Sequence, residues 1–148
     1  MNLSLKFDNV MNYYPKNKRK YIHWKSLRNF IYHLDTFPNE RQKNKIQNTL
    51  LEYLQLINER SVIEDSKDSL KYFKEYLQPI GQLYEDNLKF HIIAKTSTIV
   101  FWSSLALIVF YFLNVPYSLS IGLLSVDFLL FVRHYYYARQ KRCYSVFY

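Results

Sequence analysis

One stretch constrains the fold more than any other, because residues 96–113 carry no charged side chain. It reads TSTIVFWSSLALIVFYFL, 18 residues in all. As an α-helix it would be roughly 27 Å long, close to the ~30 Å hydrocarbon thickness of a bilayer. Lys95 precedes it and can extend its ammonium group to the membrane interface. The sequence therefore predicts a first membrane-spanning helix over about 94–113.

A second apolar run follows a short turn that contains Pro116. It covers residues 118–132 with one charge, Asp127, and leads into an aromatic and basic cluster typical of a membrane interface. We therefore expect a second span over about 117–134 and a transmembrane hairpin over 91–137. A buried hairpin of a soluble protein is disfavoured, because the remaining chain has too little apolar surface to cover it. The residues expected to anchor the hairpin at the interface are Lys95, Arg133, His134, Tyr135 and Tyr136.

The distribution of positive charge predicts the topology. Residues 1–95 carry 16 Lys and Arg, residues 133–148 carry 4, and the turn between the spans carries none. The positive-inside bias places both termini on the cytoplasmic or matrix side of an inner membrane. Residues 1–20 lack the apolar core of a secretory signal and the Arg and Ser content of a mitochondrial presequence. We interpret the net charge of +8 as a topology signal, and expect no nucleic-acid partner.

Helical periodicity dominates the rest of the chain and predicts an all-α fold, with a helical domain over 21–90. Helices are expected over 21–37 and 39–58. The second is capped by Asn39 and carries Ile46, Leu50, Leu54 and Ile57 on one face. A third begins at a capping box, Ser61–Glu64, and ends before Pro79, while a fourth runs from Ile80 into the first span without a break. Residues 138–148 form a basic, aromatic tail.

Residues 1–20 show no sustained periodicity and are expected to form a basic arm. The arm is either solvated or docked on anionic lipid headgroups or an acidic partner. RNA binding is a third option, but aromatic residues are no denser here than elsewhere in the chain. Its basic residues are Lys16, Lys18, Arg19 and Lys20.

The helical domain predicted by these patterns is small and contains no alanine. Its apolar stripes are narrow, so a core built from them is marginal. The chain also holds 15 tyrosines, whose amphipathic rings suit interfaces. These features favour a subunit that packs against other proteins.

Asp127 is the candidate polar site of the hairpin. Counting back an equal distance from the turn places it level with Ser103, with Ser104 adjacent. We expect a hydrogen-bonded contact between these hydroxyls and the carboxyl group rather than ion or proton translocation.

Enzymatic motifs are sparse. Two glycines and one cysteine exclude phosphate-binding glycine loops and cysteine metal cages, and the four histidines form no metal-ligand pair, so no metal or cofactor is expected. The segment from Arg28 to His33 resembles the Arg-x4–6-His signature of HEPN ribonucleases, including the polar residue after the arginine. That resemblance implies that Arg28 and His33 would cleave RNA as a pair.

Together these patterns predict a non-catalytic accessory subunit of a multi-protein inner-membrane complex, with lipids and other subunits as partners and no small-molecule substrate. Phe, Tyr, Met, Ile, Asn and Lys, the residues of AT-rich codons, make up 63 of the 148 residues. This bias favours a lineage-specific respiratory subunit in the mitochondrial inner membrane of an AT-rich organism. The alternative is a bacterial two-span effector that assembles a pore in the inner membrane, as in phage defence.

Overall fold

The computed structural model describes residues 3–59, 63, 65–92 and 96–145, and most of them are helical. The chain divides into two compact units. The helical unit comprises Met1–Ile92 and Lys141–Tyr148, and the hairpin unit comprises Ile93–Gln140. The C-terminal tail therefore belongs to the same unit as the helical domain, although the sequence had suggested a separate segment. The predicted anchor Lys95 lies outside the described residues.

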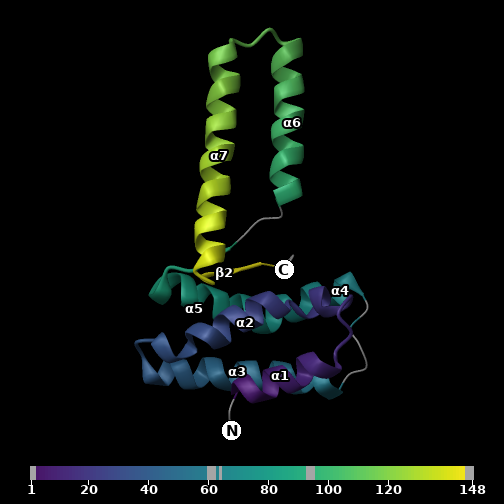
Figure 1. The fold of residues 1–148 in the computed structure, drawn as a ribbon, viewed down its shortest axis with the longest axis vertical. Coiled ribbons are helices and arrows are strands. Elements are labelled where there is room, and N and C mark those ends of the chain that lie inside the picture. Colours follow the sequence, from purple (N-terminus) through teal and green to yellow (C-terminus); the bar gives the residue numbers. More distant parts are fainter. Residues whose placement is uncertain (1–2, 60–62, 64, 93–95, 146–148) are drawn as a thin grey trace. The chain divides into compact units, whose positions relative to one another are not determined.

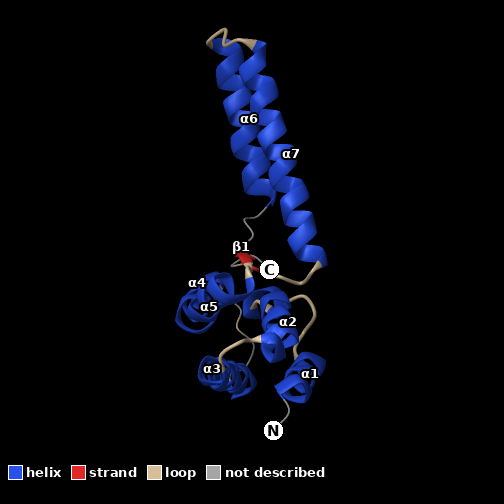
Figure 2. Cartoon of the chain, turned by 90° about the vertical axis from the view of Figure 1, so that its left-hand side faces the viewer, coloured by secondary structure: helices blue, strands red, loops and turns tan. Residues whose placement is uncertain are grey.

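The helical unit is built from α-helices and short 3₁₀ and π-helical segments, and Figure 2 shows several of the helices almost end-on. Helix α1 contacts α2 and α3, and α3 also contacts the turn between α4 and α5. Short 3₁₀ segments flank α2 on both sides. The elements are α1 (Leu3–Tyr13), η1 (Arg19–Ile22), α2 (Trp24–His33), η2 (Leu34–Thr36), α3 (Glu40–Glu59), α4 (Ser66–Tyr72), η3 (Phe73–Leu77), α5 (Gln78–Leu88), β1 (His91–Ile92) and β2 (Cys143–Tyr144).

The N-terminal segment is a helix rather than an arm. Helix α1 buries Leu3, Phe7, Val10 and Met11, which recur at helical spacing on one face. Tyr14, directly after the helix, is also buried. The prediction of an arm without periodicity over residues 1–20 is therefore wrong for residues 3–14. The sequence pattern did not indicate this helix because the apolar face of α1 is short and interrupted by polar residues.

Helix α3 confirms the sequence prediction closely. Its side chains Ile46, Leu50, Leu54 and Ile57 are all buried, as their i, i+4 spacing indicates. The side chain of Asn39 accepts a hydrogen bond from the Gln42 amide at 3.1 Å, which caps the helix as expected.

Aromatic rings fill the centre of the helical unit. Phe30 packs against Tyr84 and Tyr144, with ring centroids 4.9 and 5.5 Å apart. Tyr53 and Tyr84 are fully buried, and the Tyr84 hydroxyl donates to the Phe30 carbonyl at 2.7 Å. The expectation that tyrosines belong at interfaces is wrong for these residues, because backbone carbonyls satisfy their hydroxyl groups inside the core.

Burial also changes the chemistry of these phenols. Burial raises the pKa of the Tyr53 hydroxyl above its usual range, and the neighbouring Tyr14 and Tyr72 act in the same direction. Burial likewise raises the pKa of Tyr84, with a smaller contribution from the charge of Asp35. The core therefore holds both phenols in the neutral form.

The helix that contains Pro79 does not end there, contrary to the prediction. The turn before it, Phe73–Leu77, is π-helical, and the Gln78 amide donates to the Phe73 carbonyl five residues earlier. Proline lacks an amide hydrogen and its ring crowds the carbonyl four residues back, so a wider turn accommodates it without breaking the helix. The helix starts at Ser66, where the Asp65 side chain accepts from the Lys67 amide at 3.0 Å. The predicted capping residues Ser61 and Glu64 lie outside the described residues.

Helix α5 stops at Leu88 and does not continue into α6, so the prediction of one long helix is wrong. Lys89 adopts a left-handed conformation (φ 54°), and its amide and that of Phe90 both donate to the Tyr84 carbonyl. This turn directs Phe90 into the core, where it is 2% exposed. Burial of that ring decides the course of the chain, which a periodicity argument does not detect.

A two-residue parallel ladder then joins the tail to the end of α5. His91 pairs with Cys143, and Ile92 pairs with Tyr144. The Asn29 amide donates to the Cys143 carbonyl at 2.7 Å, and the Ser145 amide donates to the Ser26 hydroxyl at 3.1 Å. The tail is therefore held by polar residues on the buried side of α2.

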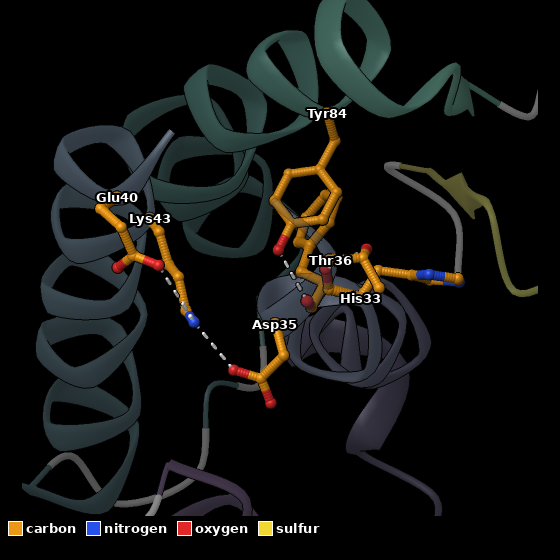
Figure 3. A network of polar contacts seen from close by, with 7 residues as sticks. His33, Asp35, Thr36, Glu40, Lys43 and Tyr84 are labelled. Carbon is orange, nitrogen blue, oxygen red and sulfur yellow. Dashed lines mark hydrogen bonds and ion pairs between the residues drawn. The ribbon is translucent and has the colours of Figure 1, made fainter. Parts of the chain in front are cut away.

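The junction between α2 and α3 is held by polar contacts (Figure 3). The Thr36 hydroxyl donates to the His33 carbonyl at 2.8 Å, which closes the turn after α2. Lys43 on α3 reaches Asp35 at 3.1 Å and Glu40 at 3.9 Å. Because Asp35 and Glu40 are largely exposed, this ion-pair group fixes the loop geometry more than it adds stability.

The hairpin unit consists of two helices, α6 (Thr96–Phe112) and α7 (Tyr117–Arg139), which lie side by side (Figure 1). A short turn joins them, in which Asn114 is left-handed (φ 51°) and Pro116 is the N-cap of α7. Proline at this point is compatible with a helix start, because the first amides of a helix have no partner within it.

Candidate functional site: the polar seam of the α6–α7 hairpin

The hairpin exposes large apolar side chains over most of its surface. Several are more than half exposed, including Phe101, Trp102, Ile108, Phe112, Phe128, Leu129 and Phe131. Within the described part of the chain, α7 is the one helix that is long and apolar enough to cross a membrane, and none of its apolar window is buried. The apolar part of α6, Ile99–Phe112, is shorter.

The half-buried side chains of the hairpin follow a regular spacing, and we call this set the seam. On α7 they recur at alternating intervals of three and four residues, which is the spacing of two helices that pack along each other. Three polar residues of α7, Ser120, Asp127 and His134, follow each other at intervals of seven positions within this set, whereas the outward surface of the hairpin is predominantly apolar. The seam comprises Ile99, Ser103, Ala106, Leu107 and Phe110 of α6, and Ser120, Leu123, Asp127, Leu130, His134 and Tyr137 of α7.

Asp127 lies in this seam and is half-buried. The Ser103 hydroxyl is also in the seam but donates to the Ile99 carbonyl of its own helix at 3.0 Å. Ser104 is exposed on the other side of α6. Among the described residues the Asp127 carboxylate has no hydrogen-bond or ion-pair partner, so the expected contact with Ser103 and Ser104 is not formed. Asp127 is half-buried in the seam, but a serine within a helix can satisfy its hydroxyl on its own backbone, as Ser103 does.

The predicted interface anchors other than Lys95 lie on the last turns of α7. Tyr135 and Tyr136 are 63% and 55% exposed, and Arg133 is also exposed. His134 is half-buried in the seam, one heptad after Asp127. The aromatic and basic residues therefore surround the end of α7 rather than forming one pocket.

The basic residues of the predicted arm have different surroundings. Lys16 and Lys20 are exposed, and Lys18 is half-buried. The guanidinium group of Arg19 donates to the carbonyls of Tyr14 and Met11, near the C-terminal end of α1. Arg19 therefore satisfies backbone carbonyls at the helix end, a structural role that the sequence pattern did not indicate.

Arg28 and His33, the pair in the HEPN-like segment, are not brought together. Arg28 is exposed and lies over the ring of Trp24, 5.0 Å from its centroid. His33 meets the ring of Phe90 edge-on at 5.3 Å. A separation of five residues on a helix corresponds to a rotation of about 140° around the axis, so the two side chains leave α2 in different directions. Their aromatic contacts give each a packing role.

The described residues contain no group of three or more His, Cys, Asp or Glu side chains that could hold a metal ion. Cys143 is buried beside Asn29, whose amide approaches its sulfur at 3.5 Å. The features that the sequence analysis missed are the outward face of α2 and the docking of the tail. The four-residue spacing of Trp24, Arg28 and Tyr32 was a visible signal for the outward face of α2. No local pattern indicated the docking of the tail.

These features define a small helical protein with an exposed apolar hairpin whose seam carries polar residues. In comparisons with known proteins, no family model, curated protein or solved structure matches the chain.

Proposed function

We propose that the chain is a non-catalytic, two-span accessory subunit of a multi-protein inner-membrane complex, with α6 and α7 in the bilayer and the helical unit on the cytoplasmic or matrix side. The observation that carries this proposal is the exposed apolar surface of the hairpin. A soluble protein rarely exposes a contiguous apolar patch of more than a few hundred Å². In a bilayer the same surface contacts lipid chains.

The hydroxyl groups of the hairpin support an apolar surrounding. The hydroxyls of Ser103 and Ser125 donate to the carbonyls four residues earlier, at 3.0 and 2.8 Å. Such bonds satisfy a hydroxyl without water. The helix α6, at 17 residues, spans roughly 26 Å, and α7 is longer.

Asp127 supports a role as a subunit. A carboxylate within a span costs a few kcal/mol when it lacks a partner. Asp127 is half-buried in the seam and keeps part of its surface exposed, so a neighbouring span could donate a hydrogen bond or a positive charge to it. Such a span would come from another protein of the complex, and the mitochondrial inner membrane is the setting favoured by the residue bias.

Extraction in a mild detergent followed by native mass spectrometry tests this proposal. We expect a complex that contains several different proteins in fixed proportion. A monomeric chain without partners would contradict the proposal. The Asp127→Asn variant is expected to leave insertion intact and to weaken the complex, whereas Ser104→Ala, on the exposed side of α6, serves as the matched control.

The second candidate is a self-assembled pore, favoured by the seven-residue spacing of Ser120, Asp127 and His134 on one side of α7. In a ring of hairpins these side chains could line a polar path. The same mass measurement would then return multiples of this chain alone. Conductance across a planar bilayer, reduced by Asp127→Asn, would support the pore.

A further inference from the structure

The outward face of α2 combines aromatic rings and positive charge. Trp24, Arg28 and Tyr32 follow each other at intervals of four residues, so they lie on one side of the helix. Arg28 is exposed, Tyr32 is 60% exposed and Trp24 is half-buried. The opposite side of α2 carries Leu27 and Phe30, which are fully buried in the core. Core packing therefore fixes which side of α2 faces outward.

Each ring on this surface has a cationic group beside it. The Arg28 guanidinium carbon lies 5.0 Å from the ring centroid of Trp24. The ammonium nitrogen of Lys141 lies 3.8 Å from the centroid of Tyr32, and that of Lys20 lies 4.9 Å from the centroid of the adjacent Tyr21. We call these six residues the α2 face. Its cations are held against rings with their charge at the surface.

The surrounding sequence adds a local excess of basic over acidic residues. Residues 9–34 contain six Lys and Arg and no Asp or Glu. The next acidic residue, Asp35, forms an ion pair with Lys43 of α3 at 3.1 Å. The α2 face is therefore complementary to an anionic surface.

We propose that the α2 face docks on the anionic phospholipid surface of the membrane that holds the hairpin. Tryptophan and tyrosine rings favour the headgroup level, and lysine and arginine side chains favour lipid phosphates. A lipid surface is favoured over RNA because one cation of the α2 face is close to the proposed span along the chain. Lys141 follows Arg139, the last residue of α7, by only two positions and is therefore within about 7 Å of it. The inference rests on the proposed insertion of the hairpin, and places the lipid contact on α2 rather than on an N-terminal arm.

The two tryptophans of the chain allow the two proposals to be tested separately. Trp102 lies on α6 and is 62% exposed, whereas Trp24 lies on the α2 face. The full chain is reconstituted into vesicles of phosphatidylcholine alone or mixed with phosphatidylglycerol. The Trp24→Phe variant then reports on the hairpin, and the Trp102→Phe variant reports on the α2 face.

We expect nitroxide-labelled acyl chains to quench Trp102 in both kinds of vesicle. A nitroxide on the lipid headgroup should quench Trp24 in the anionic vesicles and much less in the neutral ones. In the Trp102→Phe background, Lys20→Glu combined with Arg28→Glu should lower the ratio of docked to undocked chains by at least about fivefold for each of the two basic residues replaced. Lys67→Glu combined with Lys74→Glu makes the same change in net charge on exposed positions of α4 and η3, and should leave Trp24 quenched.

The failures are distinguishable. Quenched Trp102 with unquenched Trp24 in anionic vesicles would overturn the docking and leave the insertion intact, and so would equal quenching of Trp24 in neutral vesicles. Unquenched Trp102 would overturn the insertion and the docking that rests on it. If single-stranded RNA, and not anionic lipid, changes the emission of Trp24, the α2 face is a nucleic-acid surface and the proposal is wrong.

Discussion

The contact between Gly81 and Tyr144 allows a sharp test of how the tail is held in the helical unit. A Cβ atom at Gly81 would overlap the ring atoms Cδ2, Cε2 and Cζ of Tyr144. Tyr144 is 2% exposed, and its ring packs against those of Phe30 and Phe73, with centroids 5.5 and 6.3 Å away. It therefore cannot move without leaving the core. Gly81 itself has an ordinary helical φ, so the substitution to alanine strains no backbone angle.

Two opposing terms decide the outcome of Gly81→Ala. Replacing glycine by alanine inside a helix gains about 0.8–1.0 kcal/mol of helix propensity. Forcing an extra methyl group into a filled core costs about 1–3 kcal/mol. We therefore expect a net loss of up to about 2 kcal/mol in the free energy of unfolding of the helical unit. In a Tyr144→Val background all three overlapping atoms are absent, so the same Gly81→Ala change should stabilise the unit by about 1 kcal/mol.

Urea unfolding in detergent measures this, with Trp24 fluorescence as the probe in a Trp102→Phe background. The four chains of the double-mutant cycle give the coupling energy between positions 81 and 144, expected at about 1–3 kcal/mol. Gly122→Ala is the matched control, because a Cβ there meets nothing within 4 Å. If Gly81→Ala has the same effect with Tyr144 and with Val at position 144, the overlap does not control the tail and the reasoning is refuted.

Three further predictions concern polar side chains of the core and of the seam. Because burial raises the pKa of Tyr53 and Tyr84, their contribution to stability is complete below the unfolded-state pKa of 10.0 and is lost at higher pH. Above pH 10 the free energy of unfolding measured in urea should fall by up to about 1.4 kcal/mol per pH unit for each of the two tyrosines. The Tyr84→Phe variant should show a shallower slope. Asn29→Ala leaves the Cys143 carbonyl without its 2.7 Å donor, at a cost of about 1–3 kcal/mol; maleimide should then label the buried thiol about tenfold faster or more, and an unchanged rate would contradict the role of Asn29. Asp127→Asn keeps the shape of the side chain and removes its charge, so acyl-chain quenching of Trp102 should stay the same; a loss of insertion would show that the charge itself is required.

The accuracy of the sequence predictions varied along the chain for identifiable reasons. The face of α3 was predicted because four aliphatic residues, Ile46, Leu50, Leu54 and Ile57, recur at helical spacing over about three turns. The course around Pro79 was not, because a π-helical turn depends on the packing of Phe73 and Leu77 in the core. The end of α5 was missed for a similar reason, since the burial of Phe90 involves packing against Phe30, which is distant in sequence.

The candidate site shows the same division. The seven-residue spacing of Ser120, Asp127 and His134 could be read directly, because one helix determines it. The local bond of Ser103, which leaves Asp127 without that donor, depends on a rotamer choice within α6. The pairing of Lys141 with Tyr32 joins positions more than a hundred residues apart, and no local pattern predicts such a contact.

The sequence by itself determined the helical class, the apolar character of residues 96–113 and 118–132, and the flanking positive charge, because periodicity and composition are local properties. Tertiary structure decided that residues 3–14 form part of the core, that the tail returns to α2, and that α2 presents a cationic and aromatic face. The physical reason is that burial depends on which partners a side chain meets. Those partners come from segments that only the folded chain brings together.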